Sequence, residues 1–254
     1  MLWRTCEDEV KDGLILGIQF LTRIPINKAV EFSKENIRNS LFFFPFIGIL
    51  IGAIASLAFY FIGQINMEIS AFLTVITLII LTGGLHIDGL SDMLDGFLSN
   101  RDSKKTLEIM KDSRVGAFGV MGIVLLILGK YIILKNISFE MWIIIVISIA
   151  NSRFVGGLII ESKKPARKGG LGELFHSSNP KRNIAYSGTI YVLILLFLDI
   201  TYIIPLIITY IFAELISAWS LKKIGGLTGD VYGGIMEISE LISLLSYWGL
   251  LLWI

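Results

Sequence analysis

Long apolar runs separated by short polar segments dominate the chain. Seven of them are long enough, or nearly so, to predict membrane-spanning helices: residues 41–62, 69–85, 116–134, 141–160, 184–198, 202–221 and 231–254. An earlier apolar segment, residues 13–26, is too short to span and carries Arg23, so we expect it to lie in the interface or to re-enter the membrane. The pattern predicts an all-α fold, a polytopic membrane helical bundle of about seven transmembrane helices plus an N-terminal interfacial or re-entrant helix. We expect residues 1–254 to form a single integral membrane domain.

The composition agrees with this pattern. Of 254 residues, 54% are hydrophobic and only 17% are charged, which is too apolar for a soluble domain and makes the lipid bilayer a partner. The net charge is +1 and the basic residues are dispersed, so we expect no nucleic-acid partner. The single cysteine, Cys6, excludes an internal disulfide framework. Positions 7–9 hold acidic residues where a cleavable signal peptide would have its basic region, so the sequence does not indicate a cleavable signal.

Segments rich in lysine and arginine alternate along the chain with segments that nearly lack them. This alternation predicts the orientation of the protein in the membrane. Most of the 22 lie in segments 1–40, 97–115, 161–183 and 222–230, whereas the turns 63–68, 135–140 and 199–201 hold only Lys135. Basic loops are retained in the cytoplasm. We therefore expect a cell-membrane protein with a cytoplasmic N-terminus, an external C-terminus and a functional site that faces the cytoplasm.

Three aspartates follow the second apolar run. In Leu81-Thr-Gly-Gly-Leu-His-Ile-Asp-Gly-Leu-Ser-Asp-Met-Leu-Asp-Gly96, residues Asp88, Asp92 and Asp95 are spaced i, i+4 and i+7. On a helix they fall within about 60° of one another. Like charges this close repel, and a divalent cation would compensate them. Mg2+ is commonly held by carboxylates and substrate phosphates, although these aspartates could also be a solvated helix end.

A second stretch, at residues 225–240, echoes the first. Both read Gly-Gly-Leu-x-x-Asp with an acid seven residues later, which pairs Asp88 with Asp95 and Asp230 with Glu237. Glycines allow the backbone to approach a phosphate, or only allow close helix packing. We expect spans 69–85 and 202–221 to be neighbours and to bring Asp230 to Asp88. The candidate phosphate-binding glycines are Gly83, Gly84 and Gly226.

Three further polar side chains stand out in the apolar runs. Arg153 must face the bundle interior, pair with an acid such as Glu214, bind a phosphate, or snorkel to the interface. His86, two residues before Asp88, is either a base, a ligand or a structural residue, and His176 is a weaker candidate. Nucleophilic triads and Walker, Rossmann or zinc patterns are absent from the sequence.

Two classes of function fit these features. A metal-dependent phosphoryl or prenyl transferase would gather acids and arginines at one membrane face, to meet a diphosphate. An ion-coupled transporter would place them near the midplane between repeats. The acids lie at predicted cytoplasmic helix ends, which favours the enzyme.

At these residues the chain resembles the cobalamin synthase family, also called adenosylcobinamide-GDP ribazoletransferases. The resemblance rests on motifs along nearly the whole chain, and the Asn-Asp-x-x-x-Asp pattern of prenyltransferases is absent. The matching motifs are Phe20-Leu-Thr-Arg-Ile-Pro25, Phe44-Pro-Phe-Ile-Gly48, Leu81 to Gly96, Lys111-Asp-Ser-Arg-Val-Gly-Ala-Phe-Gly119, Pro165 to Phe175 and Gly225 to Glu240.

The resemblance implies the assembly of the cobalamin nucleotide loop. Adenosylcobinamide-GDP and α-ribazole, or α-ribazole 5′-phosphate, would give adenosylcobalamin, or its 5′-phosphate, and GMP. It implies Mg2+, for which Mn2+ could substitute, and allows a homo-oligomer. Together with the residue analysis above, it assigns the metal ligands to Asp88, Asp92, Asp95, Asp230 and Glu237. The candidate catalytic residues are Asp88, Asp92, Asp230 and, from its position alone, His86. The candidate phosphate contacts are Arg114, Arg153 and Arg167.

Overall fold

The computed structural model describes residues 6–251, and in this range the protein is all-α apart from one isolated β-bridge. The predicted fold class is confirmed. Eleven α-helices follow one another within this range: α1 Cys6–Leu21, α2 Lys34–Gly63, α3 Met67–Thr82, α4 Leu85–Leu98, α5 Ser103–Ile109, α6 Ala117–Lys135, α7 Trp142–Ser162, α8 Leu171–Ser177, α9 Lys181–Leu198, α10 Ile203–Ile224 and α11 Gly229–Leu251.

Helix ends follow local sequence signals. The Ser33 side chain accepts a hydrogen bond from the backbone of Asn36 and begins α2, and Asn66 begins α3 in the same way through Ile69. Helices α3 and α10 end at Gly83 and Gly225, both in the left-handed conformation that glycine adopts without strain. These two ends lead into the candidate site.

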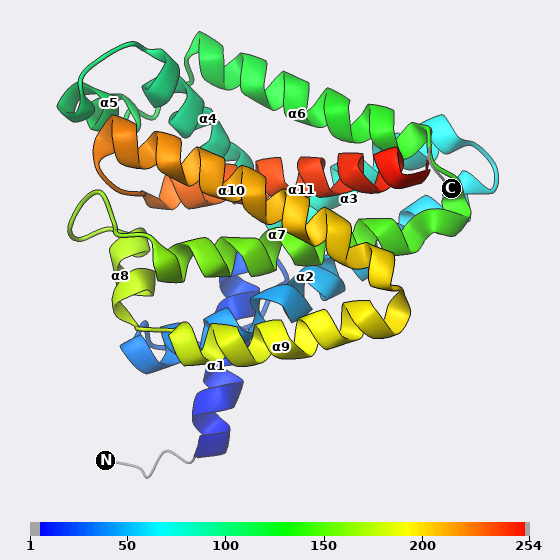
Figure 1. Cartoon of the computed structure of the whole chain (residues 1–254), viewed down its shortest axis with the longest axis horizontal. Coiled ribbons are helices and arrows are strands. Elements are labelled where there is room, and N and C mark those ends of the chain that lie inside the picture. Colours follow the sequence, from blue (N-terminus) through cyan, green and yellow to red (C-terminus); the bar gives the residue numbers. More distant parts are fainter. Residues whose placement is uncertain (1–5, 252–254) are drawn as a thin grey trace.

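Helix α7 lies at the centre of the bundle, between α2 on one side and α10 and α11 on the other (Figure 1). Its contact with α2 is close because Gly48 and Gly52 face it. A β-carbon added to either glycine would lie 2.7 Å from the Cα of Ala150 or 2.5 Å from the Cα of Val146. Two small residues four apart are the usual device for close helix packing in membranes.

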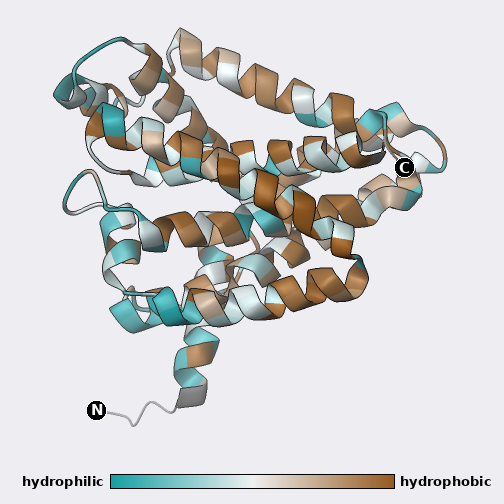
Figure 2. Ribbon diagram, in the orientation of Figure 1, coloured by the Kyte–Doolittle hydropathy of each residue, from teal (hydrophilic) through white to brown (hydrophobic). Residues whose placement is uncertain are grey.

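Four segments are long and apolar enough to cross a membrane: α2, α6, α7 with the 3₁₀ turn before it, and α10 with its preceding turn. The pair α3 and α4, bent by 90°, adds a fifth if it counts as one span. Hydrophobic residues cover the middle of these helices, while polar residues gather on α1, α5 and α8 (Figure 2). The protein is thus a polytopic helical membrane protein with four to five candidate spans.

The expected total of about seven also included α9 and α11. Helix α9 begins with Lys181, Arg182 and Asn183, which lower its mean hydropathy, and α11 carries three acids. Within the described residues neither qualifies as a span by length and composition, and residues 252–254 of the expected span 231–254 lie outside the described range. The expected interfacial segment, residues 13–26, is helical only to Leu21 and then continues without regular structure to residue 33.

The expected pairing of spans 69–85 and 202–221 is wrong for the helices named. Among the described residues, α3 and α10 are not a packed pair; the helices that follow them, α4 and α11, form one of the most extensive contacts. The reason is the bend after each span, since the chain turns at Gly83–Gly84 and at Gly225–Gly226 before the acidic helices meet.

Candidate active site

The site is built on two helix–turn–helix units that share the Gly-Gly-Leu-x-x-Asp pattern. Gly83 and Gly84 both have positive φ, +66° and +70°, and let the chain turn from α3 into α4. Asp88 then lies in the first turn of α4. In the second unit Gly225 has φ of +78°, and Asp230 lies in the first turn of α11. Acids at helix N-termini are stabilised by the helix dipole.

Glycines let the two units approach each other closely. A β-carbon on Gly89 would lie 2.8 Å from the backbone oxygen of Asp230, and one on Gly233 would lie 3.2 Å from the Cα of His86. Helices α4 and α11 therefore cross with backbone against backbone. Asp88 and Asp230 come close enough to act electrostatically on Asp92, one turn further along α4. The predicted convergence of Asp88 and Asp230 is present, on α4 and α11.

A third segment brings Arg167 to the same place. The loop before α8 is joined to the turn before α11 by two backbone bonds, from Ala166 N to the Leu227 oxygen (2.8 Å) and from Leu227 N to the Lys164 oxygen (3.0 Å). Gly226 is required there, because a β-carbon would lie 2.5 Å from the Ala166 nitrogen. As a result Arg167 Nη2 lies 3.4 Å from Asp230 Oδ2, which also accepts from the Thr228 hydroxyl at 3.1 Å.

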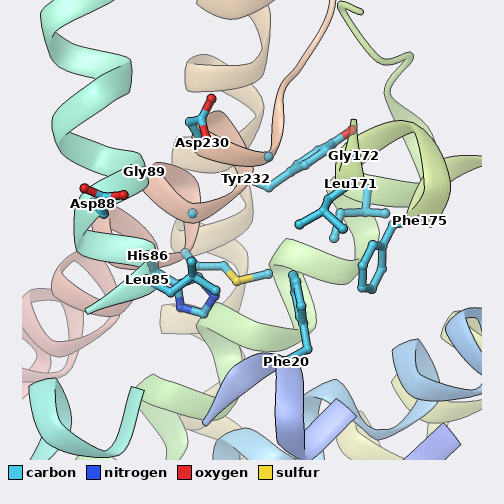
Figure 3. A pocket seen from close by; sticks show the side chains of 14 residues that line it. Phe20, Leu85, His86, Asp88, Gly89, Leu171, Gly172, Phe175, Asp230 and Tyr232 are labelled. Carbon is cyan, nitrogen blue, oxygen red and sulfur yellow. The ribbon is translucent and has the colours of Figure 1, made fainter. Parts of the chain in front are cut away.

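A pocket of about 110 Å3 lies directly beside these carboxylates. Its wall is formed mainly by apolar side chains from five helices, α1, α4, α7, α8 and α11 (Figure 3). The Phe20 and Phe175 rings lie on the opposite side from Asp88 (Figure 3). His86 is part of this wall and is only 4% exposed, and neither of its ring nitrogens has a hydrogen-bond partner among the described residues.

Two predicted metal ligands have other partners. Asp95 is buried and its carboxylate accepts hydrogen bonds from the backbone of Gly116 (2.7 Å) and Gly119 (2.9 Å), so it caps the start of α6. Glu237 is buried and pairs with Lys130 at 2.7 Å. Both lie two helical turns beyond the first acid of their motif, about 10.5 Å along the helix axis from Asp88 and Asp230 respectively.

Arg153 lies fully buried inside the bundle and pairs with Glu240 at 3.1 Å. The sequence offered Glu214 as its partner, and this is wrong: Glu214 pairs with Lys163 at 2.6 Å near the end of α7. Lys130 also contacts Glu240, at 3.1 Å. Two cations and two acids thus form a compact buried ion cluster, consisting of Lys130, Arg153, Glu237 and Glu240.

Two other candidates lie apart from the pocket. Arg114 is exposed and forks onto Asp112 in the same loop, and this hydrogen bonding lowers the pKa of Asp112 to about 2. His176 Nδ1 lies 2.9 Å from the Ile160 carbonyl oxygen and ties α8 to the end of α7. Among the glycine candidates, Gly84 has open space around it, whereas Gly226 is enclosed by the Pro165–Ala166 backbone.

The structure also brings Arg23 to the first glycine turn, an arginine that was not predicted to contact phosphate. The Arg23 side chain lies over Gly83, where a β-carbon would collide with it, and the Arg23 backbone donates to the Leu81 oxygen at 2.6 Å. Arg23 is exposed and next to the first glycine turn. Its place in the Phe20 to Pro25 motif was the available signal.

The residues present can fit a Mg2+ ion that is completed by a ligand. No ready-made group of three or more metal-binding side chains occurs in the described part of the chain. However, Asp88 is exposed and lines the pocket with Asp230, and both carboxylates act electrostatically on the partly buried Asp92. Mg2+ prefers one or two carboxylates together with substrate phosphates, and this arrangement offers such a partial site.

These features define a polytopic membrane protein with a carboxylate and arginine site beside an apolar pocket. The family model described as cobalamin-5-phosphate synthase matches residues 13–248, and this chain belongs to that family. It is similar to curated proteins named adenosylcobinamide-GDP ribazoletransferase. The protein of Treponema denticola is 36% identical and covers 90% of this chain and 94% of its own length; that of Clostridium kluyveri is 36% identical (93% and 96%) and that of Clostridium acetobutylicum 34% identical (94% and 96%). No solved structure matches.

Proposed function

We propose that this protein is an adenosylcobinamide-GDP ribazoletransferase. Family membership over nearly the whole chain supports the activity. The observation that carries the assignment to this site is the close crossing of α4 and α11, which brings Asp88, Asp92 and Asp230 together with Arg167. Acids and an arginine at one opening are the groups needed to hold a diphosphate and its counter-ion.

The reaction is the transfer of a cobinamide phosphoryl group to a ribose hydroxyl of α-ribazole or α-ribazole 5′-phosphate. The hydroxyl oxygen forms a bond to the cobinamide-side phosphorus, and the bond from this phosphorus to the bridging oxygen breaks, so that GMP leaves. The hydroxyl proton passes to a carboxylate. Catalysis of this kind depends mainly on positioning and on neutralising negative charge.

Each residue at the opening has a distinct proposed role. Asp88 and Asp92 would hold Mg2+, which when bound would supply positive charge near the diphosphate. Asp230 is either a further ligand or the proton acceptor. Arg167 now contacts Asp230, and it can turn its guanidinium to two phosphate oxygens when the substrate arrives. Arg23 beside Gly83 is a second arginine within the same region.

Four of the predicted site residues have no role in the proposed reaction because their partners lie elsewhere in the described structure: Asp95, Glu237, Arg114 and Arg153. His86 remains a residue of the proposed site, where it forms part of the pocket wall. We further propose that the opening faces the cytoplasm, on the side of the basic loops, and that residues 1–254 act as one membrane domain.

The experiment measures GMP release by purified protein in liposomes without any ion gradient. Adenosylcobinamide-GDP, α-ribazole and Mg2+ should suffice for turnover, excess EDTA should stop it, and Mg2+ or Mn2+ should restore it. Asp92→Asn should insert normally and release no GMP. Full turnover in EDTA would reject the metal role. Transport of an ion or substrate without any GMP release would favour the transporter class.

A further inference from the structure

The apolar pocket beside Asp88 has a lining that the phosphate chemistry does not use. We define the aromatic pocket by Phe20, Leu171, Phe175, Tyr232 and Met236, which surround it together with His86. The Phe20 and Phe175 ring centroids are 4.7 Å apart and their planes are inclined by 36°. Figure 3 shows both rings and the Leu171 side chain on the side of the pocket opposite Asp88. Three separate parts of the chain therefore supply one apolar wall.

This wall is held in place from behind. The buried Phe44 ring of α2 lies 6.2 Å from both Phe20 and Phe175. On the other side Gly172 lets α8 approach α11, since a β-carbon there would lie 3.0 Å from the Tyr232 ring. A pocket fixed by packed aromatic rings binds a rigid ligand with little loss of conformational entropy.

The size and polarity of the pocket select among the ring systems of the proposed reaction. A volume of about 110 Å3 is close to the roughly 150 Å3 of an apolar cavity that accepts benzene. It is far too small for a corrin ring. Guanine fits poorly because its several donors and acceptors would lose their water without finding partners on an apolar wall. The dimethylbenzimidazole of α-ribazole is flat, apolar and carries a single free ring nitrogen.

His86 offers a partner for that one nitrogen. It is buried in the pocket wall, and its two ring nitrogens have no hydrogen-bond partner among the described residues. An unsatisfied buried polar group costs free energy, and a ligand that completes it recovers this cost. One donor on an apolar wall matches one acceptor on an apolar ring.

We propose that the aromatic pocket binds the dimethylbenzimidazole base of the ribazole substrate. The benzo edge lies against Phe20, Phe175 and Leu171, and a ring N–H of His86 donates to the unsubstituted ring nitrogen. The ribose then lies at the mouth, where Asp88 and Asp230 meet the reacting hydroxyl. This inference rests on the proposed function and adds to it the residues that determine which base is accepted.

The test compares two variants on the same helix. Leu171→Ala removes a side chain of the pocket wall, whereas Leu174→Ala removes one of similar exposure, 40% against 48%, that does not line the pocket. With saturating adenosylcobinamide-GDP, Leu171→Ala and Phe20→Leu should each raise KM for α-ribazole about 3- to 10-fold, the loss expected for one aromatic or apolar contact. Their kcat and the KM for adenosylcobinamide-GDP should change by less than about 2-fold, and Leu174→Ala should match the wild type.

A second readout does not depend on turnover. Binding of α-ribazole alone, followed by its benzimidazole fluorescence without Mg2+ or the second substrate, should weaken in Leu171→Ala and Phe20→Leu by the same factor. The preference for α-ribazole over the riboside of unsubstituted benzimidazole should also fall, because the methyl groups lose contacts. His86→Phe should weaken α-ribazole binding more than it weakens binding of an indole riboside, which lacks the acceptor nitrogen.

The outcomes separate this inference from the proposed function. No GMP release by the wild type would reject the function. An active wild type whose pocket variants raise only the KM for adenosylcobinamide-GDP would place a part of that substrate in the pocket and overturn the inference. Unchanged α-ribazole binding in folded Leu171→Ala and Phe20→Leu proteins would also overturn it.

Discussion

The close crossing of α4 and α11 should be essential for turnover, and Gly89→Ala tests this directly. The added β-carbon would lie 2.8 Å from the Asp230 backbone oxygen and 3.1 Å from its Cα. Ordinary contact begins near 3.4 Å, so the backbones must separate by about 0.6 Å or more. A backbone atom cannot rotate away as a side chain could. The whole first turn of α11, with Asp230, has to move relative to Asp88.

A displacement approaching 1 Å between catalytic groups can cost about 100-fold in rate. We expect Gly89→Ala to lower kcat for GMP release about 10- to 100-fold. Overpacking should also cost about 1–3 kcal/mol of unfolding free energy. The thermal midpoint in detergent separates the two effects, because the rate is measured well below the transition, where the variant is folded.

Gly157→Ala is the matched control. Gly157 also lies within a helix, α7, but the nearest atom to its added β-carbon is the Ile184 methyl at 3.9 Å. Alanine is favoured over glycine inside helices by up to about 1 kcal/mol, so this variant should be fully active and no less stable. If folded Gly89→Ala kept half of the wild-type kcat or more, the close crossing would not set the catalytic geometry.

Two further predictions concern buried charged residues, and a third concerns the membrane topology. Asp95→Asn should lower the thermal midpoint, since a charged hydrogen bond to backbone is worth about 1.5–3 kcal/mol, while the Mg2+ concentration for half-maximal GMP release stays unchanged; a raised Mg2+ requirement would return Asp95 to the metal site. Arg153→Leu should destabilise the protein by about 3–5 kcal/mol in denaturation assays because Lys130 is then the one cation left in the buried cluster for Glu237 and Glu240, whereas Glu214→Gln, in a more exposed pair, should cost less than about 1 kcal/mol; equal effects would refute the difference in burial. A C-terminal reporter should be active outside the cytoplasm, because the expected cytoplasmic N-terminus with an odd number of spans, such as the five that include the bent α3–α4 pair, places the C-terminus outside; activity in the cytoplasm would refute an odd number of spans.

The helices and the acidic turns could be predicted from local sequence. Apolar runs gave most of the helix ranges, and the repeated Gly-Gly-Leu-x-x-Asp spacing indicated that Asp88 and Asp230 meet. Local patterns also explain the 90° bend, because two consecutive glycines permit a turn that other residues resist. Each of these signals depends only on a few adjacent residues, so the sequence alone is enough to find it.

The partners of the buried charges could not be predicted in this way. Arg153 pairs with Glu240, 87 residues away, and Lys130 with Glu237, 107 residues away. Which helices pack together depends on small residues at each contact and not on the charged residues themselves. Glu214 was a reasonable partner by depth in the membrane alone, but it faces Lys163 on another side of α10. Arg23 was missed for a similar reason, since it reaches Gly83 only because the segment after α1 folds back onto Leu81.

The second acid of the repeated motif has the same role in both copies. Seven residues along a helix correspond to about 10.5 Å, or two turns, so Asp95 and Glu237 lie well below the opening where Asp88 and Asp230 meet. Asp95 joins α4 to the start of α6, and Glu237 joins α11 to Lys130 in the middle of α6. Each acidic helix is therefore fixed to α6 by its second acid while its first acid faces the opening. Of the five metal ligands that were predicted, two thus anchor helices through their carboxylates, which leaves Asp88, Asp92 and Asp230 as the acids of the proposed site.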